Sequence, residues 1–202
     1  MDTQINENHE RYLDRVRIYR RNGYDIEKSR KFILNVSSPL TGKILEIGTG
    51  KGHTTLVLAR SGYRFISVDI SAQEQELARL NLRYYGVEYR VTFRIEDAQK
   101  MSFRDNSFDS IISVNTIHHV ENPLKMMDEV ARLLNRDGRA IISEFTKEGM
   151  DIIDRIHASE GRTHEHSASG VGLDDVEEYF TRKHFRIERK ANAFQQVLVM
   201  YK

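Results

Sequence analysis

Apolar strand-like runs alternate with helical segments from Lys43 to Phe145, and this alternation constrains the fold more than any other feature. Between the second and third runs, Ser71 and Glu74 form a capping box and Gly86 stands where that helix should stop. Strands joined by helices of this length need right-handed crossovers. The sequence therefore predicts an α/β fold with a parallel, doubly wound sheet. The runs are KILEIG (43–48), YRFISVD (63–69), YRVTFRIED (89–97), FDSIISVN (108–115) and GRAIISEF (138–145).

The two ends of the chain depart from this alternation. Residues 7 to 36 read as two short helices around the break RNGYD, and Tyr12, Val16 and Tyr19 fall on one face of the first. The stretch HFRIERKANAFQQVLVMYK (184–202) holds two strand-like runs with no helix between them. We therefore expect these two runs to pair as an antiparallel hairpin.

The composition excludes several classes of function. The chain has 31 Lys plus Arg against 30 Asp plus Glu, so its net charge of +1 gives no reason to expect a polyanionic partner. Eight basic residues between Arg11 and Lys31 are a local exception, which we interpret as a solvated helical face. Without cysteine there is no disulfide, cysteine zinc site or thiol nucleophile. No apolar run approaches the length of a membrane span, so we expect a soluble, cytoplasmic protein.

A glycine-rich turn, KILEIGTGKGHTT (43–55), closes the first strand. It is not a P-loop, because Gly50-Lys51 is followed by Gly52 instead of a hydroxyl residue. It also departs from the dinucleotide fingerprint, since the spacing is G-x-G-x-G and Glu46 lies two residues before the first glycine. A carboxylate there would repel a pyrophosphate and suit a ligand with positive charge. The turn therefore predicts a cationic ligand without phosphates.

Two further carboxylates close the next two strands. Asp69 ends the second strand, where it can accept hydrogen bonds from both ribose hydroxyls. Asp97 ends the third strand, where it could accept from an exocyclic adenine amine, with the N–H of Ala98 serving a ring nitrogen. An amine, a ribose and an adenine without phosphate describe S-adenosylmethionine.

The motifs ILEIGTGKG, VDIS and EDAQKMSFRDNSFDSIISVNTIHHVENPLKMMDEVARLLNRDGRAIISEF resemble those of class I S-adenosylmethionine-dependent methyltransferases. Within that superfamily they are most similar to the small-molecule type that includes the ubiquinone and menaquinone biosynthesis enzymes. The resemblance covers about residues 40–146 and the terminal hairpin. It implies a Rossmann-like seven-stranded sheet of order 3-2-1-4-5-7-6 with strand seven antiparallel. The cofactor-binding residues that we expect are Glu46, Gly48, Thr49, Gly50, Gly52, Asp69, Ile70, Asp97, Ala98 and Asn115.

The resemblance also implies how the single domain is divided. Residues 1–36 would form an N-terminal helical cover, and 37–146 the cofactor-binding core. Residues 147–183 would be a substrate-side insert acting as a lid, and 184–202 the terminal hairpin. Glu46, Gly48 and Gly50 would line the methionine part of the cofactor, which Asn115 would also approach.

Motifs that the chain lacks reduce the range of possible methyl acceptors. It has no Asn/Asp-Pro-Pro-aromatic motif after the fourth strand, which enzymes acting on base amines or glutamine amides usually carry. It has no cysteine for thiol addition to pyrimidines. A small molecule with an oxygen, nitrogen or carbon nucleophile remains the leading expectation. His118 and His119, in the loop after the fourth strand, and Glu144, at the end of the fifth, are the catalytic candidates.

The segment after the fifth strand supplies candidate substrate contacts. We expect Tyr19, His157 and His164 to face the acceptor, and Gly161, Gly170 and Gly172 would let the segment close as a mobile lid. A metal held by His157, Glu160, His164 and His166 is an alternative that we do not adopt, because the helical two-histidine spacing is absent.

Three other functions stay open at this stage. The basic N-terminal helices would serve an RNA-modifying methyltransferase, although we consider nucleic acid an unlikely partner. A non-catalytic module that binds S-adenosylmethionine is a second alternative. A nicotinamide dehydrogenase is a distant third, which Glu46 and the glycine spacing disfavour. The oligomeric state cannot be read from the sequence.

Overall fold

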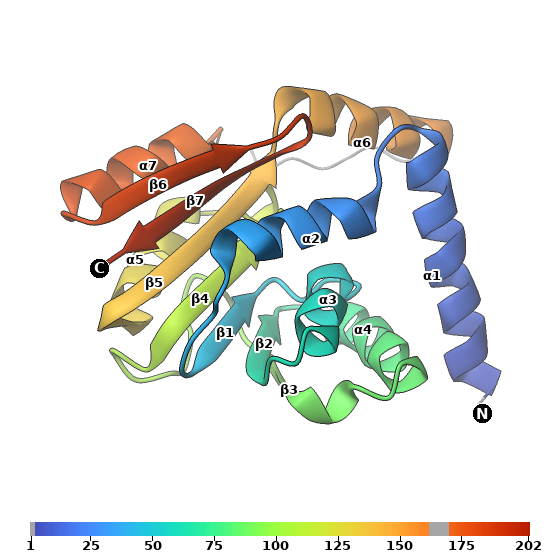
Figure 1. Cartoon of the computed structure of the whole chain (residues 1–202), viewed down its shortest axis with the longest axis horizontal. Helices are drawn as coiled ribbons and strands as arrows, with labels where there is room; N and C mark the ends of the chain where they lie inside the picture. Colours follow the sequence, from blue (N-terminus) through green and yellow to red (C-terminus); the bar gives the residue numbers. More distant parts are fainter. Residues whose placement is uncertain (1–2, 162–169) are drawn as a thin grey trace.

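A seven-stranded mixed sheet is the centre of the computed structural model, which describes residues 3–161 and 170–202. The strand order is β3-β2-β1-β4-β5-β7-β6 (Figure 1). Strands β1 to β5 pair in parallel, and β7 runs antiparallel to both β5 and β6. The predicted sheet order and the antiparallel seventh strand are confirmed. The strands are β1 (Ile44–Ile47), β2 (Phe65–Asp69), β3 (Val91–Ile95), β4 (Phe108–Val114), β5 (Leu134–Phe145), β6 (Arg186–Ala191) and β7 (Gln195–Tyr201).

Helices cover both faces of the sheet. One face carries a core with α2, α3 and α4, and the other a core with α5 and α7. Alternate residues of each strand enter the two cores, as Ile44 and Leu45 of β1 do. The helices are α1 (Thr3–Arg21), α2 (Ile26–Ser37), α3 (His53–Arg60), α4 (Ala72–Tyr84), α5 (Pro123–Leu133), α6 (Lys147–Ser159) and α7 (Leu173–Arg182), with short 3₁₀ turns η1 (Glu88–Arg90) and η2 (Ile117–His119).

Local capping chemistry sets where the helices begin. The Ser71 hydroxyl accepts a hydrogen bond from the backbone N–H of Glu74 at 3.2 Å, which is one half of the predicted capping box, while the N–H of Ser71 donates to Asp69 and not to Glu74. Asp25 and Asn122 cap α2 and α5 in the same way, and Pro123 stands at the first position of α5. Gly86, at a φ of 65°, follows α4 as expected. The N-termini of these helices are therefore determined by sequence signals that span a few residues.

The N-terminal helices pack against the domain instead of standing free. Helix α1 is a single helix of 19 residues, longer than the sequence indicated, and it lies along α4 (Figure 1). Tyr12 and Val16 enter the core beside α3, while Tyr19 joins a third apolar cluster with Tyr24 and Ile153. This third cluster connects α1 and α2 to α6.

The segment 147–183, interpreted from the sequence as one insert, contains two helices with different surroundings. Helix α6 packs against α1 through the third cluster. Helix α7 instead buries Leu173, Val176 and Phe180 in the sheet core next to α5. Because the apolar residues of α7 are buried against the sheet, α7 packs as the crossover helix between β5 and β6. Of these two helices, α6 is the one that contributes to the cavity described below, through His157.

Candidate active site

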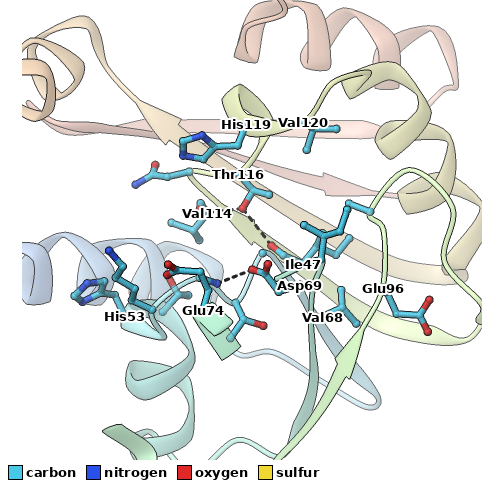
Figure 2. A pocket seen from close by; sticks show the side chains of 18 of the residues that line it. Ile47, His53, Val68, Asp69, Glu74, Glu96, Val114, Thr116, His119 and Val120 are labelled. Carbon is cyan, nitrogen blue, oxygen red and sulfur yellow. Dashed lines mark hydrogen bonds between the residues drawn. The ribbon is translucent and has the colours of Figure 1, made fainter. Parts of the chain in front are cut away.

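A cavity of about 650 Å³ opens at the carboxyl ends of the central strands. Its walls come from the glycine turn after β1, the ends of β2 and β4, the loop after β3, and helices α1, α2 and α6. Figure 2 shows Asp69 near the middle, with His53 toward one side of the view and Glu96 toward the other. Ligands of open α/β sheets bind at this position.

The glycine turn needs glycine for two separate reasons. A Cβ on Gly48 would lie 2.1 Å from Oγ1 of Thr116, and a Cβ on Gly52 would lie 2.7 Å from the Cβ of Ala78. These two glycines allow the chain to pack closely. Gly50 has a φ of 47° and nothing within 4 Å of a Cβ, so its open side faces the cavity. A ligand can therefore approach the backbone there.

Asp69 is held by the turn that it faces. Its Oδ2 accepts from the N–H of Gly50 at 2.7 Å, and its Oδ1 accepts from the N–H of Ser71 at 2.9 Å. Each oxygen keeps a second lone pair, which suits the paired hydroxyls of a ribose. Thr49, also predicted for the site, is buried and bonds through Oγ1 to the hydroxyl of Ser67 at 2.6 Å. Thr49 therefore contributes to the wall mainly through its backbone.

The residues predicted to form an adenine subsite lie at and after the ends of β2 and β3. Asp97, Ala98 and Ile70 all line the cavity. Asp97 is oriented by the N–H of Gln99, which donates to its Oδ1 at 2.8 Å. Ile70 is 70% exposed, which is unusual for a large apolar side chain. Its exposed surface offers a platform for the flat face of a base.

Asn115 is the feature that most directly indicates a ligand. It follows β4 with a φ of 54°, and its backbone N–H donates to the carbonyl of Ser143 at 2.8 Å. Within the described part of the chain, neither Oδ1 nor Nδ2 of its buried side-chain amide has a hydrogen-bond partner. An unsatisfied buried polar group costs about 1–3 kcal/mol. A polar group of a ligand in the cavity would remove that cost, and the amino end of the methionine part fits.

Glu46 differs from its predicted location. It is buried behind the turn, and it is not among the residues that line the cavity. Its Oε2 accepts from the hydroxyls of Thr55 at 2.8 Å and Ser67 at 2.6 Å. Alternation along β1 directs this side chain to the face of the sheet that α3 covers, and its Oε1 is buried without a hydrogen-bond partner among the described residues. Burial raises the pKa of Glu46 to about 7.

A side chamber of about 150 Å³ adjoins the cavity. Tyr19, His119 and His157 line both spaces, whereas His118 lines the side chamber. The chamber has aromatic, imidazole and aliphatic walls from α1, α2, α6 and the segment after β4. The structure therefore brings Tyr19, His118, His119 and His157 together beside the larger cavity.

Glu144 supports this chamber without lining it. Its Oε1 accepts from the N–H of Ile117 at 2.8 Å, and its Oε2 lies 2.6 Å from Nδ1 of His118. Both side chains are largely buried. A carboxylate on Nδ1 places the proton of the neutral ring there, so the basic lone pair is on Nε2. Glu144 therefore orients His118 and the turn that carries it.

Helix α6 is joined to the N-terminal cover at the chamber. The hydroxyl of Tyr19 lies 3.5 Å from Nε2 of His157, and Arg15 forms an ion pair with Glu160. His164 and His166 lie outside the described residues. Among residues 3–161 and 170–202, no group of three or more His, Asp or Glu side chains is arranged to hold a metal ion. No helix in the same ranges is long and apolar enough to cross a membrane.

Several lining residues were not predicted, and two of them lie where the cavity meets the side chamber. Arg30 of α2 and His53, the first residue of α3, line both the cavity and the chamber. Burial, with help from Arg30, lowers the pKa of His53 to about 3, so this ring is neutral. In the sequence, Arg30 is only one member of a basic run, and such a run does not indicate which of its side chains face a cavity.

The comparisons with known proteins agree with this geometry. Residues 45–142 match the sequence profile of a methyltransferase domain family. Over these residues the chain is similar to S-adenosylmethionine-dependent methyltransferases, whose cofactor is S-adenosyl-L-methionine.

Two curated relatives are similar to part of the chain. The uncharacterized methyltransferase YcgJ of Bacillus subtilis is 36% identical over 100 residues, which are 50% of this chain and 39% of that protein. A demethylmenaquinone methyltransferase of Clavibacter sepedonicus is 32% identical over 119 residues, which are 58% of this chain and 47% of that protein. The aligned region therefore spans less than half the length of these relatives.

Solved structures show that the fold is shared. A SAM-dependent methyltransferase from Aquifex aeolicus has a TM-score of 0.63 at 19% identity, covering 88% of this chain and 89% of that chain. The [4+2]-cyclase SpnF has a TM-score of 0.66 at 16% identity, covering 87% and 80%. Since a cyclase shares this fold, the reaction has to be argued from the site.

Proposed function

We propose that this protein transfers the methyl group of S-adenosyl-L-methionine to a small-molecule acceptor bound in the side chamber. The observation that carries the proposal is the junction of two spaces. A cavity with strand-end carboxylates and the unsatisfied Asn115 amide opens into a small chamber containing the His118–Glu144 pair. The chamber size of about 150 Å³ suits a compact molecule.

The residues of the cavity would hold the cofactor by its separate parts. Asp69 would accept from the ribose hydroxyls, while Asp97 and the N–H of Ala98 would bind the adenine edge beside Ile70. Gly48, Gly50 and Asn115 would line the methionine part. When bound, S-adenosyl-L-methionine supplies an electrophilic methyl group on a positively charged sulfur. Much of the rate can then come from alignment of the acceptor.

His118 would remove a proton from the acceptor where one must be lost. Glu144 accepts from Nδ1–H and holds the ring, so Nε2 can receive the proton of an acceptor hydroxyl. His119, whose ring centroid lies 4.1 Å from that of His118, would assist in orienting the acceptor. Glu144 is then a positioning residue, because it acts through His118.

Helix α6 would close the chamber against water. Its His157 lines the cavity and meets Tyr19 of the cover, so both helices contribute to one wall. Closure would desolvate the acceptor and fix its direction.

Replacing His157 and His164 by alanine should change cofactor affinity by less than about threefold, roughly 0.7 kcal/mol. Methyl transfer should fall far more. Equal losses in both would contradict the lid.

The test combines an acceptor screen with matched histidine variants. The protein would be incubated with methyl-labelled S-adenosyl-L-methionine and panels of small phenols, amines and carbon acids, and products followed by mass spectrometry. His118→Gln and Glu144→Gln should lose about 100-fold or more in turnover of a hydroxyl acceptor. His184→Gln, on an exposed residue outside the cavities, should not. Tight RNA binding that weakens steeply with salt, without small-molecule turnover, would overturn the proposal.

A further inference from the structure

A further groove of about 290 Å³ lies between α1, the glycine turn and α4, and we call it the α1 groove. Helix α1 lies along α4 (Figure 1), and the groove follows the contact between these two helices. It shares Arg15, Lys51 and His53 with the main cavity, but only His53 with the side chamber. The α1 groove is therefore next to the site described above and separate from the chamber proposed for the acceptor.

The walls of the α1 groove are largely apolar. Tyr12 and Ile18 of α1 line it, and Leu77 of α4 lines it as well. The ring centroids of Tyr12 and His53 are 5.2 Å apart. Burial lowers the pKa of His53 to about 3, so this ring is neutral and adds no charge. Walls of this kind favour a ligand with an apolar body.

Two buried asparagines connect the walls of the groove. Nδ2 of Asn8 donates to the carbonyl of Leu77 at 3.1 Å and to Oδ1 of Asn81 at 3.0 Å. Nδ2 of Asn81 donates to the carbonyl of Lys51 at 3.4 Å. His53 differs, because its Nδ1 is buried without a hydrogen-bond partner in the described part of the chain. A polar atom of a ligand would satisfy that nitrogen, whereas the asparagines hold α1, α4 and the turn together.

The charge of the α1 groove is positive. Asp14, the acidic residue among those that line it, is paired with Arg17, and Arg15 is paired with Glu160. Within residues 3–161 and 170–202, Arg11 and Lys51 form no ion pair. Both are exposed, so water solvates them, but their charges attract an anion to the groove. Apolar walls beside two unpaired cations fit an anion with an apolar body.

We propose that the α1 groove is a second binding site, and that its ligand is a small carboxylic acid with an apolar body. The body would lie between Ile18 and Leu77, and the carboxylate would pair with Arg11 and Lys51. A guanidinium can bind a carboxylate through two parallel hydrogen bonds, which gives Arg11 the larger share of the specificity. This ligand contacts α1 on one side and the body of the domain on the other.

A ligand in the α1 groove would also strengthen cofactor binding, a consequence that rests on the proposed cofactor site. Lys51 and His53 flank Gly52, which packs against α4, and Gly50 of the same turn lines the main cavity. Helix α1 lines both spaces, so each ligand favours the state in which α1 is packed on the domain. Two ligands that favour the same state bind cooperatively. We expect the acid to raise the affinity for S-adenosylhomocysteine by about fivefold.

Calorimetry on the full chain with 4-phenylbutyrate as the probe tests the proposal. The uncharged 4-phenylbutanamide has the same body, and the wild type should bind it about tenfold more weakly than the acid. Arg11→Met keeps an unbranched apolar side chain without the charge. It should weaken acid binding by about fivefold or more and change amide binding by less than about twofold. Arg21→Met removes a cation from an exposed position of the same helix outside the described cavities, and should leave both affinities unchanged.

A variant that fills the groove provides the second measurement. Leu77→Trp should abolish binding of the acid and of the amide, while the affinity for S-adenosylhomocysteine stays within about twofold, which shows that the variant is folded. Four results would each overturn the proposal: no binding of the acid at about 10 mM, equal binding of acid and amide, equal losses in Arg11→Met and Arg21→Met, or displacement of S-adenosylhomocysteine by the acid. A wild type that binds the acid as expected but not S-adenosylhomocysteine would support the groove and refute the cofactor site.

Discussion

Asp69 offers the most direct test of the cofactor site. Each of its carboxylate oxygens already accepts one backbone N–H, from Gly50 and from Ser71, which fixes the carboxylate in one orientation. The remaining lone pairs face the cavity. Replacement of Asp69 by alanine would remove both acceptors for the ribose and release the two N–H groups at the same time.

The expected magnitude follows from these bonds. Hydrogen bonds to a charged group contribute about 1.5–3 kcal/mol. Since the two hydroxyls share one carboxylate, we expect one such increment, which is a loss of about ten- to hundred-fold in affinity. Asp69→Asn should lose a similar amount, because its amide nitrogen would face one of the two backbone N–H donors.

Isothermal titration calorimetry with S-adenosylhomocysteine measures this loss. Asp137→Ala, on an exposed residue of β5 outside the described cavities, is the matched charge control and should bind like the wild type. Thermal denaturation of each variant would separate lost binding from lost folding. An unchanged affinity in Asp69→Ala, or a preference of the wild type for NAD over S-adenosylhomocysteine, would refute the assignment.

Two further predictions concern Gly48, in the glycine turn, and Glu46, on β1. Gly48→Ala should lower the free energy of unfolding by about 2–5 kcal/mol in urea titrations, because its Cβ would overlap Thr116 at a φ of 87°. Gly23→Ala, at a φ of 91° with open space around it, should show only the conformational part, about 1–2 kcal/mol, and equal losses would contradict the packing argument. The pKa of Glu46 is raised from 4.5 to about 7 in the folded state, so its protonated form is favoured there and stability is lost as the pH rises through that range. Glu46→Gln should remove this loss, and urea titrations at pH 5 and pH 8 that show the same pH dependence in both proteins would contradict it.

The residues at the ends of β2 and β3 could be predicted from the sequence, because the signals that mark them are local. A strand-end aspartate lies at the carboxyl edge of a parallel sheet wherever its strand is placed, so Asp69 and Asp97 could be assigned from their positions in the runs. The capping of α4 by Ser71 depends on a contact three residues away. The sheet order came from the resemblance of the motifs, and the structure confirms it.

The direction of Glu46 and the role of α7 depended on tertiary structure. Glu46 was expected to face the ligand because of its position before the glycines, whereas alternation in the assembled sheet directs it to Thr55 of α3. The helix of residues 173–182 is amphipathic, but only the sheet decides which core its apolar face enters.

What the sequence determined by itself is the five alternating strands, the terminal hairpin, the glycine turn and the carboxylates at the strand ends, because periodicity and capping act over a few residues. What only the tertiary structure decided is which distant groups meet. Glu144 reaches His118 across 26 positions, and Gln195 reaches the Tyr24 that holds Arg30 across 171. Such pairs arise from strand order and helix packing, which bring side chains together at distances that no local pattern encodes. The acceptor side of the site is built almost entirely from contacts of this kind.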